Sequence, residues 1–205
     1  MDCYIFGAGP YFGLQKRPAE NDYVIAADGG YRWCLQESVK PDLLLGDFDS
    51  IDTMPSGVKT EQFPVDKDDT DMMLAVKKGL SNGARMFHLY GGTGGRMDHT
   101  LANLQTLIFL AEHKACGLLY AQDAVYTAIK DGSITLKARP SGLLSVFCFG
   151  ADAQNVTIQG AQYSLQNGTL SAGFPLGVSN HFVGTPVNIS VGSGSLVIAF
   201  PYEKS

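Results

Sequence analysis

The sequence predicts a chain of two parts, a mainly parallel α/β domain over residues 1–120 and a small all-β sandwich over residues 121–205. In the first part short apolar runs alternate with helix-period stretches, which is typical of a parallel sheet with helices on both faces. Between residues 141 and 202 the chain carries one formally charged residue, Asp152, and its short alternating runs are separated by glycine and asparagine. That pattern indicates antiparallel strands joined by turns.

The individual elements follow from these runs. The strands expected in the first part are 3–6, 23–27, 43–45 and 85–90, and the expected helices are 70–80 and 98–113. The strands expected in the second part are 143–149, 156–159, 187–191 and 196–200. Ligands of open α/β sheets bind beyond the carboxyl ends of the strands, so functional residues are expected directly after the strands of the first part.

The composition excludes several classes of protein. Hydrophobic residues make up 45% of the 205 residues and charged residues 17%, so a packed globular chain is expected and disorder is excluded. The net charge is −5, and the 15 basic residues form no cluster. Nucleic-acid and anionic-membrane partners are therefore not expected, and a small-molecule partner is favoured.

Cysteine usage and hydropathy bear on the compartment. Four cysteines stand at positions 3, 34, 116 and 148 without a CxxC pair, so we expect reduced core thiols rather than a zinc knuckle, a redox pair or a disulfide framework. No basic segment or cleavage signal opens the sequence, and the longest apolar run, 104–111, is far shorter than the roughly 18 residues that span a bilayer. The sequence therefore predicts a cytoplasmic protein with no membrane-spanning segment.

Acidic residues are concentrated in one window. Aspartates outnumber glutamates 15 to 5, and eight of the aspartates lie between residues 42 and 71, where the formal charge is −7. Like charges this dense repel one another unless solvent or cations screen them, and short carboxylates are suitable ligands for Mg²⁺. A divalent metal site and a solvated acidic surface both explain such a run, so the positions of the acids must distinguish them.

The first acidic pair stands where a metal site is expected. Asp47 and Asp49 directly follow the apolar run 43–46, at the carboxyl end of an expected strand. An extended chain would place both carboxylates on the same side, because side chains two residues apart share a face. Both are predicted metal ligands.

The second acidic group, 66–71, precedes a helix. An acid or Thr70 in this position can cap the exposed N–H groups of the first helical turn, so at least one member is interpreted as a cap. Asp71 is predicted as a third metal ligand, whereas Asp66 and Asp69 are interpreted as part of a solvated surface.

A glycine-rich segment, 91–99, follows the expected strand 85–90 and opens a helix. Its four glycines can present backbone N–H groups inward, and Arg96 supplies a forked cation, so the segment can hold phosphate oxygens. It is not a Walker loop, because the GxxxxGK[ST] pattern occurs nowhere in the chain. The alternative is a flexible turn with a surface arginine, in which Asp98 is an N-cap and His99 is structural.

Two other motifs were weighed and are not favoured. The segment 7–13, with Asp28 some twenty residues on, is similar to a dinucleotide-binding fingerprint, but its third glycine is one position late and Pro10 interrupts the turn into a helix. The segment 43–51 is similar to the nucleophile motif of haloacid-dehalogenase-type phosphatases, which would use Asp47. That motif, however, usually lies on the first strand and carries Thr or Val where this chain has Ile51.

Taken together and in order, these motifs resemble thiamine pyrophosphokinase. The resemblance rests on the segments 27–30, 41–42, 46–50, 67–71 and 91–99 and on Asn103, with looser matches at 160–165 and 179–180. It implies an α/β nucleotide domain joined to a β-sandwich, and a homodimer whose active sites lie between the subunits. It also implies the reaction, in which the hydroxyethyl oxygen of thiamine attacks the β-phosphorus of ATP, so that thiamine diphosphate forms and AMP leaves.

The resemblance also assigns roles to residues of this chain. Mg²⁺ would be held by Asp47, Asp49 and Asp71, which with Arg96 form the implied catalytic group and supply a general base whose identity stays open. The implied ATP contacts are Asp28, Gly29, Lys67, Asp68, Thr70, Gly92, Gly94, Gly95, Arg96, Asp98, His99 and Asn103. The implied thiamine contacts are Tyr163, which would stack on the ligand, together with Ser179 and Asn180.

The chain departs from the family pattern in two places. The usual Gly-Leu-Lys-(Tyr/Trp) motif reads Gly160-Ala161-Gln162-Tyr163, and Lys67 stands where some members carry glutamine. Two other functions stay open at the level of sequence: a phosphatase that works through a phosphorylated Asp47, and a non-catalytic sensor of thiamine or nucleotide.

Overall fold

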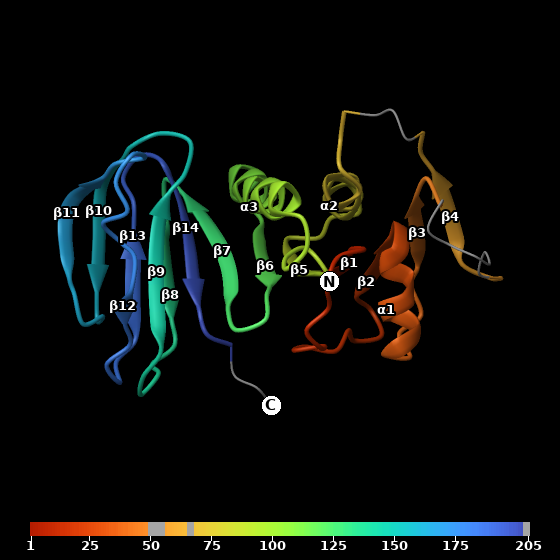
Figure 1. Ribbon diagram of the computed structural model, residues 1–205, viewed down its shortest axis with the longest axis horizontal. Helices are drawn as coiled ribbons and strands as arrows, with labels where there is room; N and C mark the ends of the chain where they lie inside the picture. The colour runs from red at the N-terminus through yellow and green to blue at the C-terminus, as the bar shows by residue number, and fades with distance from the viewer. Residues whose placement is uncertain (49–55, 65–67, 203–205) are drawn as a thin grey trace.

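One sheet of ten strands runs the length of the molecule, and a second sheet of four strands packs against one end of it (Figure 1). The structure is a computed structural model that describes residues 1–48, 56–64 and 68–202. The helices are η1 (Asp28–Gly30), α1 (Tyr31–Gln36), α2 (Asp71–Ser81) and α3 (Met97–Glu112).

The strands divide between the two parts of the chain. Those of the first part are β1 (Asp2–Phe6), β2 (Tyr23–Ala27), β3 (Leu43–Gly46), β4 (Lys59–Gln62), β5 (Met86–Tyr90) and β6 (Cys116–Tyr120). Those of the second part are β7 (Val125–Lys130), β8 (Ser133–Leu136), β9 (Leu143–Cys148), β10 (Ala153–Gln159), β11 (Leu165–Leu170), β12 (Asn180–His181), β13 (Val187–Ser190) and β14 (Ser195–Phe200).

The first six strands form the parallel half of the large sheet, in the order β6-β5-β1-β2-β3-β4. Strands β1, β2 and β3 are buried almost throughout, as expected for apolar strands with cover on both faces. Helices α2 and α3 cover one face, and α1 with the segment 7–22 covers the other (Figure 1). The predicted parallel α/β fold is confirmed.

The large sheet continues past residue 120, because β6 pairs with β7 in the antiparallel sense. Strand β14 then lies between β7 and β9, and β12 pairs with the outer side of β9. The small sheet, in the order β11-β10-β13-β8, packs on this antiparallel end. The predicted sandwich is therefore confirmed, and one of its two sheets is the end of the large sheet. The division of the chain into domains near residue 120 stays a prediction.

Apolar side chains from both sheets form the core of the sandwich. The large sheet contributes Ile129, Leu144, Val146, Leu196 and Ile198, and the small sheet contributes Val156, Ile158, Leu170, Val187 and Ile189. These positions alternate with exposed ones along the strands, for example in β10 and β13. The alternation of apolar and polar residues that indicated strands in the sequence thus reflects the alternation of core-facing and exposed side chains.

Several elements of the first part were not predicted from the sequence: strand β6, the short helices η1 and α1, and strand β4. Helix α1 is six residues long, too short to display a helical period, and two glycines directly precede it. Strand β4 reads Lys-Thr-Glu-Gln, with no apolar residue, because it lies at the edge of the sheet beyond β3. Polar and charged side chains are common on such edge strands, where they discourage pairing with other chains.

The end of β3 corrects one expectation. An extended chain through Asp47 and Asp49 would have placed both carboxylates on one side, but Gly46 has a φ of +144° and Phe48 a φ of +67°. A left-handed residue turns the backbone, so the premise of an extended chain is wrong at Phe48. Asp49 lies outside the described residues.

Two other sequence expectations concern membrane spans and cysteines. None of the described helices combines the length and the apolar character that crossing a membrane requires. All four cysteines are free thiols; Cys3 and Cys34 are buried, and burial raises the pKa of Cys34 to about 12.

Candidate functional site

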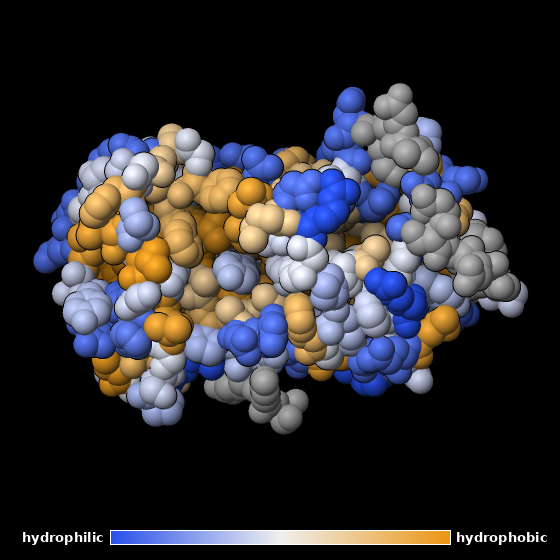
Figure 2. Space-filling model, in the orientation of Figure 1, coloured by the Kyte–Doolittle hydropathy of each residue, from blue (hydrophilic) through white to orange (hydrophobic). Residues whose placement is uncertain are grey.

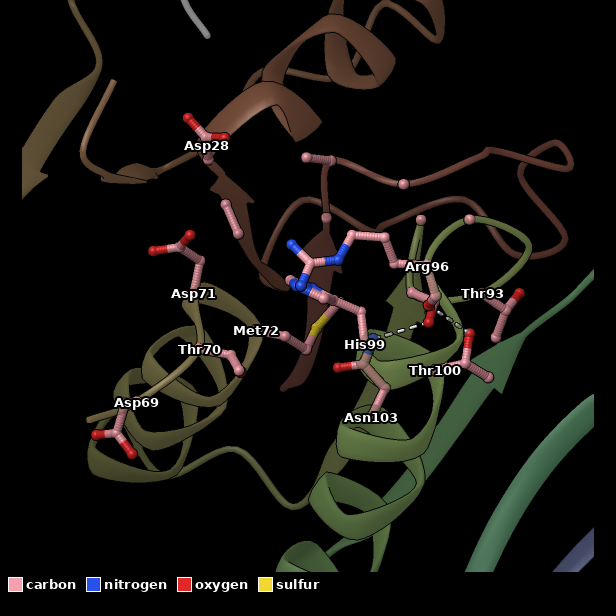
Figure 3. A pocket seen from close by; sticks show the side chains of 17 residues that line it. Asp28, Asp69, Thr70, Asp71, Met72, Thr93, Arg96, His99, Thr100 and Asn103 are labelled. Atoms are coloured by element: carbon pink, nitrogen blue, oxygen red, sulfur yellow. Dashed lines mark hydrogen bonds between the residues drawn. The ribbon is translucent and has the colours of Figure 1, made fainter. Parts of the chain in front are cut away.

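A pocket of about 400 Å³ opens at the carboxyl ends of β1, β2 and β5, between the first turns of α2 and α3 (Figure 3). Three segments that directly follow strands line it, and the first turns of the two helices complete it. The lining residues are Gly7, Ala8, Gly9, Ala27, Asp28, Asp69, Thr70, Asp71, Met72, Gly91, Gly92, Thr93, Gly95, Arg96, His99, Thr100 and Asn103. The site thus lies where the carboxyl ends of parallel strands meet.

Two glycine segments form one wall through direct backbone contact. The Gly7 N–H donates to the carbonyl of Tyr90 at 2.8 Å, and the Gly9 N–H donates to that of Gly91 at 2.9 Å. Gly91 has a φ of +64°, and a Cβ at this position would lie 2.2 Å from the Gly7 carbonyl oxygen. Only glycine permits this approach, so the wall presents backbone rather than side chains to a ligand.

A buried side chain supports the same wall from α3. Asn103 is 5% exposed, and its Nδ2 donates to the carbonyl oxygen of Gly92 at 2.8 Å. A Cβ at Gly92 would lie 3.0 Å from that Nδ2 and 2.7 Å from Leu119 Cδ1, so a larger residue would have to displace these side chains. Asn103 therefore holds the glycine segment in addition to lining the pocket.

The first turn of α2 forms the opposite side of the pocket. The Thr70 hydroxyl accepts the N–H of Met73 at 3.2 Å, which makes Thr70 the N-cap, and Asp71 follows in the first turn. Figure 3 shows the carboxylates of Asp71 and Asp28 at the same side of the pocket. Asp28 has a φ of +49°, a conformation that aspartate tolerates better than most residues. Two carboxylates from different elements therefore face one space.

Arg96 enters from the start of α3 and is bound to Asp98. Its Nε and one terminal nitrogen lie 3.2 Å and 2.6 Å from the two carboxylate oxygens. Both side chains are exposed; the ion pair keeps the pKa of Asp98 below its usual range and raises the pKa of Arg96. Asp98 also accepts the N–H of His99 at 3.0 Å. Asp98 thus stabilises the first turn of α3 and orients the cation of the pocket.

Lysines neutralise part of the acidic window. Asp69 accepts two contacts from Lys77 Nζ, at 2.6 Å and 2.8 Å, and Glu61 pairs with Lys78 at 2.7 Å and Lys59 at 3.3 Å. The contact with Lys78, above all, keeps the pKa of Glu61 below its usual range. Asp69 therefore lines the pocket with its charge already compensated by α2.

The donor set suits Mg²⁺ in its chemistry. Asp28 and Asp71 line the pocket, and a Cβ at Gly46 would lie only 3.0 Å from the Asp28 Cβ, so Asp28 packs against the end of β3 that carries Asp47. Within residues 1–48, 56–64 and 68–202 no three acidic, histidine or cysteine side chains form a metal-binding cluster. Mg²⁺ is usually held by one or two carboxylates and by substrate phosphates, so two carboxylates would be sufficient if a substrate phosphate entered this pocket.

The residues predicted from sequence fall into three groups. Those that line the pocket are Asp28, Thr70, Asp71, Gly92, Gly95, Arg96, His99 and Asn103. Those that lie beside it without lining it are Gly29, Asp47, Asp68, Gly94 and Asp98. Asp49 and Lys67 lie outside the described residues. The structure therefore brings together residues from three separate motifs, and their assigned roles stay predictions.

The lining residues that were not predicted are mostly small. They are Gly7, Ala8, Gly9, Ala27, Met72, Gly91, Thr93 and Thr100, with Asp69 expected only as a surface acid. The pair Gly7 and Gly9 was visible in the sequence, but only as a poor dinucleotide fingerprint. What the pattern could not reveal is that this segment pairs with the second glycine segment, more than eighty residues away.

The predicted thiamine residues lie on the sandwich. The Tyr163 N–H donates to Asn180 Oδ1 at 2.9 Å, and Asn180 Nδ2 donates to the Tyr163 carbonyl at 2.7 Å. Asn180 is 5% exposed, whereas Tyr163 is 62% exposed, so the buried amide presents the ring to solvent. All described residues that line the pocket precede β6. Tyr163, Ser179 and Asn180 of the same chain are therefore not among them.

Known families match both parts of the chain. A model of the thiamin pyrophosphokinase catalytic domain matches residues 14–118, and a model of its vitamin B1 binding domain matches residues 133–196. The chain belongs to the thiamine pyrophosphokinase family. The family predicted from the ordered motifs is therefore confirmed, and so is its enzymatic nature.

Individual members of the thiamine pyrophosphokinase family resemble the whole chain. Thiamine pyrophosphokinase of Bacillus subtilis (strain 168) is 27% identical over 187 residues, which cover 87% of each protein. The crystal structure of the Bacillus subtilis enzyme superposes with a TM-score of 0.90 at 24% identity and covers 100% of both chains. That of the enzyme from Geobacillus thermodenitrificans has a TM-score of 0.85 at 25% identity, covering 100% of this chain and 99% of the other.

Proposed function

We propose that this enzyme transfers pyrophosphate from ATP to the hydroxyethyl group of thiamine, with Mg²⁺, and releases thiamine diphosphate and AMP. The thiamine oxygen bonds to the β-phosphorus, the bond from that phosphorus to the bridging oxygen of AMP breaks, and AMP leaves with its electron pair. The hydroxyl proton passes to a base or to solvent. The main support is the pocket: backbone glycines, an oriented arginine and two carboxylates meet at one sheet edge in a member of this family.

The wall of glycine backbone and Arg96 suits the triphosphate of ATP. Peptide dipoles and a guanidinium stabilise negative charge without rearranging, which is the main requirement of phosphoryl-type transfer. Arg96 reaches the pocket while Asp98 holds its other side, so its direction is set before a ligand arrives. Asn103 and Thr70 keep the glycine segment and the first turn of α2 in place around that charge.

Asp28 and Asp71 would hold Mg²⁺, with Asp47 and Asp49 contributing from the end of β3. The bound cation supplies neutralisation of the phosphate charge that develops during transfer. Without such a cation, the carboxylates beside the pocket would repel the triphosphate. The carboxylates would therefore make nucleotide binding depend on a divalent cation, and one of them would accept the thiamine proton.

Thiamine would bind against the sandwich of a partner subunit. Seven of the eleven large hydrophobic residues that are exposed among those described belong to the sandwich: Leu143, Phe147, Tyr163, Phe174, Leu176, Val178 and Val183. Figure 2 shows apolar surface gathered around a hollow over this part of the molecule. Apolar surface of this kind favours association, and a homodimer could bring Tyr163 of one subunit to the pocket of the other.

The phosphatase alternative is not supported by the geometry. A nucleophilic Asp47 would have to reach the substrate pocket, but Asp47 is not among the lining residues, and Phe48 turns the chain at φ +67°. The sensor alternative predicts binding without turnover. Product analysis therefore distinguishes all three functions.

The first expected outcome is AMP formation that requires both thiamine and Mg²⁺. Purified protein is incubated with ATP, with each component omitted in turn, and AMP, ADP, inorganic phosphate and thiamine diphosphate are separated by chromatography. Equal amounts of AMP and thiamine diphosphate are expected. ADP as the nucleotide product, phosphate without ATP consumption, or no product from folded protein would contradict pyrophosphate transfer.

Replacement of Asp71 tests whether its carboxylate contributes to the proposed Mg²⁺ site. Asp71→Asn keeps the size of the side chain but removes its charge, and kcat is expected to fall about 100-fold or more because cation-mediated charge stabilisation contributes several kcal/mol. Asp69→Asn is the matched control, since its carboxylate is already paired with Lys77; its kcat should stay within about threefold. Comparable kcat values for Asp71→Asn and the parent, measured at saturating Mg²⁺, would remove Asp71 from the site.

Replacement of Tyr163 tests thiamine binding. Tyr163→Ala is expected to raise the KM for thiamine about threefold to thirtyfold through loss of the ring that faces the cationic thiazolium, with the KM for ATP unchanged. Tyr163→Phe keeps the ring and should resemble the parent. Parallel changes of both KM values in steady-state kinetics would argue that Tyr163 acts only on the fold.

Mixing the two variants tests whether the sites lie between subunits. In mixed dimers of Asp71→Asn and Tyr163→Ala chains, one of the two sites receives an intact pocket and an intact sandwich. After subunit exchange, activity at low thiamine should recover to about a quarter of the parent value, because half of the randomly formed dimers are mixed. Activity that equals the mean of the separate variants would place each site within one chain.

A further inference from the structure

The chain has a single tryptophan, and it lies behind the pocket. Trp33 is half-buried on α1, the short helix that follows Asp28 and η1. Its indole Nε1 donates to the carbonyl oxygen of Gly9 at 3.1 Å, and its ring stacks on Tyr11 with 5.3 Å between centroids. Gly9 lines the pocket, whereas Trp33 does not. The tryptophan thus contacts the glycine segment from the side opposite to the ligand space.

The segment 7–9 consists of glycine and alanine, so side-chain contacts of its own can hardly fix its position. The N–H groups of Gly7 and Gly9 bind the end of β5, where a Cβ at Gly9 would lie 2.6 Å from the Gly91 carbonyl oxygen. From α1, the Arg32 guanidinium donates to the Ala8 carbonyl and Trp33 donates to that of Gly9. The segment is therefore held on one side by backbone and on the other by two neighbouring side chains.

Helix α1 is itself fixed to the carboxyl end of β1. A Cβ at Gly30 would lie 1.8 Å from the Phe6 carbonyl oxygen, so the backbone before α1 touches the strand from which the glycine segment emerges. Asp28, which lines the pocket, is only five residues before Trp33. Trp33 therefore connects two walls of the pocket, the one that carries Asp28 and the one made by Gly7 and Gly9.

We propose that Trp33 is a positioning residue for the nucleotide. Its indole N–H sets the orientation of the peptide between Gly9 and Pro10, and thereby the shape of the pocket wall that Gly7 and Gly9 form. This role rests on the proposed function, since it requires that ATP binds in the pocket. Trp33 touches no reacting atom. Its effect reaches the ligand through backbone that must lie within tenths of an ångström of its place to match a triphosphate.

The residue also provides a direct readout. Because Trp33 is the sole tryptophan, the emission of the parent protein at indole wavelengths reports on its surroundings, which are Gly9, Tyr11 and the Arg32 guanidinium 4.4 Å over its ring. The probe is α,β-methylene ATP with Mg²⁺, in which a carbon replaces the bridging oxygen whose bond the reaction breaks. Titration should change the emission of Trp33 with the same midpoint that calorimetry gives for binding.

The decisive variant is Trp33→Phe, which keeps an aromatic ring against Tyr11 but removes the N–H donor. The Kd of the analogue, measured by calorimetry, and the KM for ATP should both rise about threefold to tenfold, as expected from loss of one neutral hydrogen bond. The KM for thiamine should stay within about twofold, because the described contacts of Trp33 are with Gly9, Tyr11 and Arg32 and not with the proposed thiamine residue Tyr163. A residue that only stabilised the fold would not separate the two KM values.

The control is Leu35→Ala on the same helix. Leu35 is 61% exposed, so its replacement perturbs α1 without touching the glycine segment, and both KM values should match those of the parent. Melting temperatures of both variants show that they are folded. Equal analogue affinities for Trp33→Phe and the parent, or an equal rise in both KM values, would overturn the positioning role. Failure of the parent to bind the analogue would instead reject the proposed function itself.

Discussion

The contact on which the pocket depends is the one between two stretches of bare backbone. The Gly9 N–H donates to the Gly91 carbonyl oxygen at 2.9 Å, and a Cβ at Gly91 would lie 2.2 Å from the Gly7 carbonyl oxygen. The backbone segments that follow β1 and β5 are therefore in direct contact, with no side chain between them. Parallel strands that lie side by side bring their carboxyl ends to the same edge, but glycine is needed for their loops to touch. The N–H groups of Gly7 and Gly9 are used in this contact, so the two segments are joined by backbone and leave the pocket wall almost without side chains.

Aromatic packing under that contact keeps the edge rigid. Phe6 stacks on Tyr90 at 5.2 Å and Tyr90 stacks on Tyr120 at 4.6 Å, so the last residues of β1, β5 and β6 are joined by rings directly below the glycine segments. Tyr11 extends the same group to Trp33. Burial raises the pKa of Tyr120 to about 12, so its hydroxyl stays neutral at physiological pH. The glycine segments therefore follow strand ends that are packed together by aromatic rings. Preorganised charge stabilisation requires such support.

The sheet also joins the two parts of the enzyme. Strand β6 pairs in the parallel sense with β5 and in the antiparallel sense with β7, so the strands that end at the pocket and one sheet of the sandwich belong to one hydrogen-bonded layer. Tyr163 nevertheless lies on the sandwich and outside the pocket; Asn180 binds its backbone N–H and carbonyl, and its ring is exposed.

The sequence by itself determined the elements with a strong period and the motifs with unusual composition. The helix around Met73 and Val76, the strands β1, β2, β3 and β5, and four strands of the sandwich were predicted, since burial of one face or of a whole strand leaves a local pattern. Strands β6, β7, β8, β11 and β12 were not predicted. Arg96, Asp71 and Asp28 were recognisable from the motifs around them. Polar strand β4 and six-residue α1 were not, because neither carries a period.

Only the tertiary structure decided how the motifs combine. The glycines at 7 and 9 had looked like a poor fingerprint, yet they complete the pocket by pairing with Gly91, a contact between segments far apart in the chain. The left-handed turn at Phe48, directly after β3, was likewise not predicted from the sequence. Local preference sets which residues can form a strand or cap a helix, whereas the pairing order of the strands sets which of them share a site.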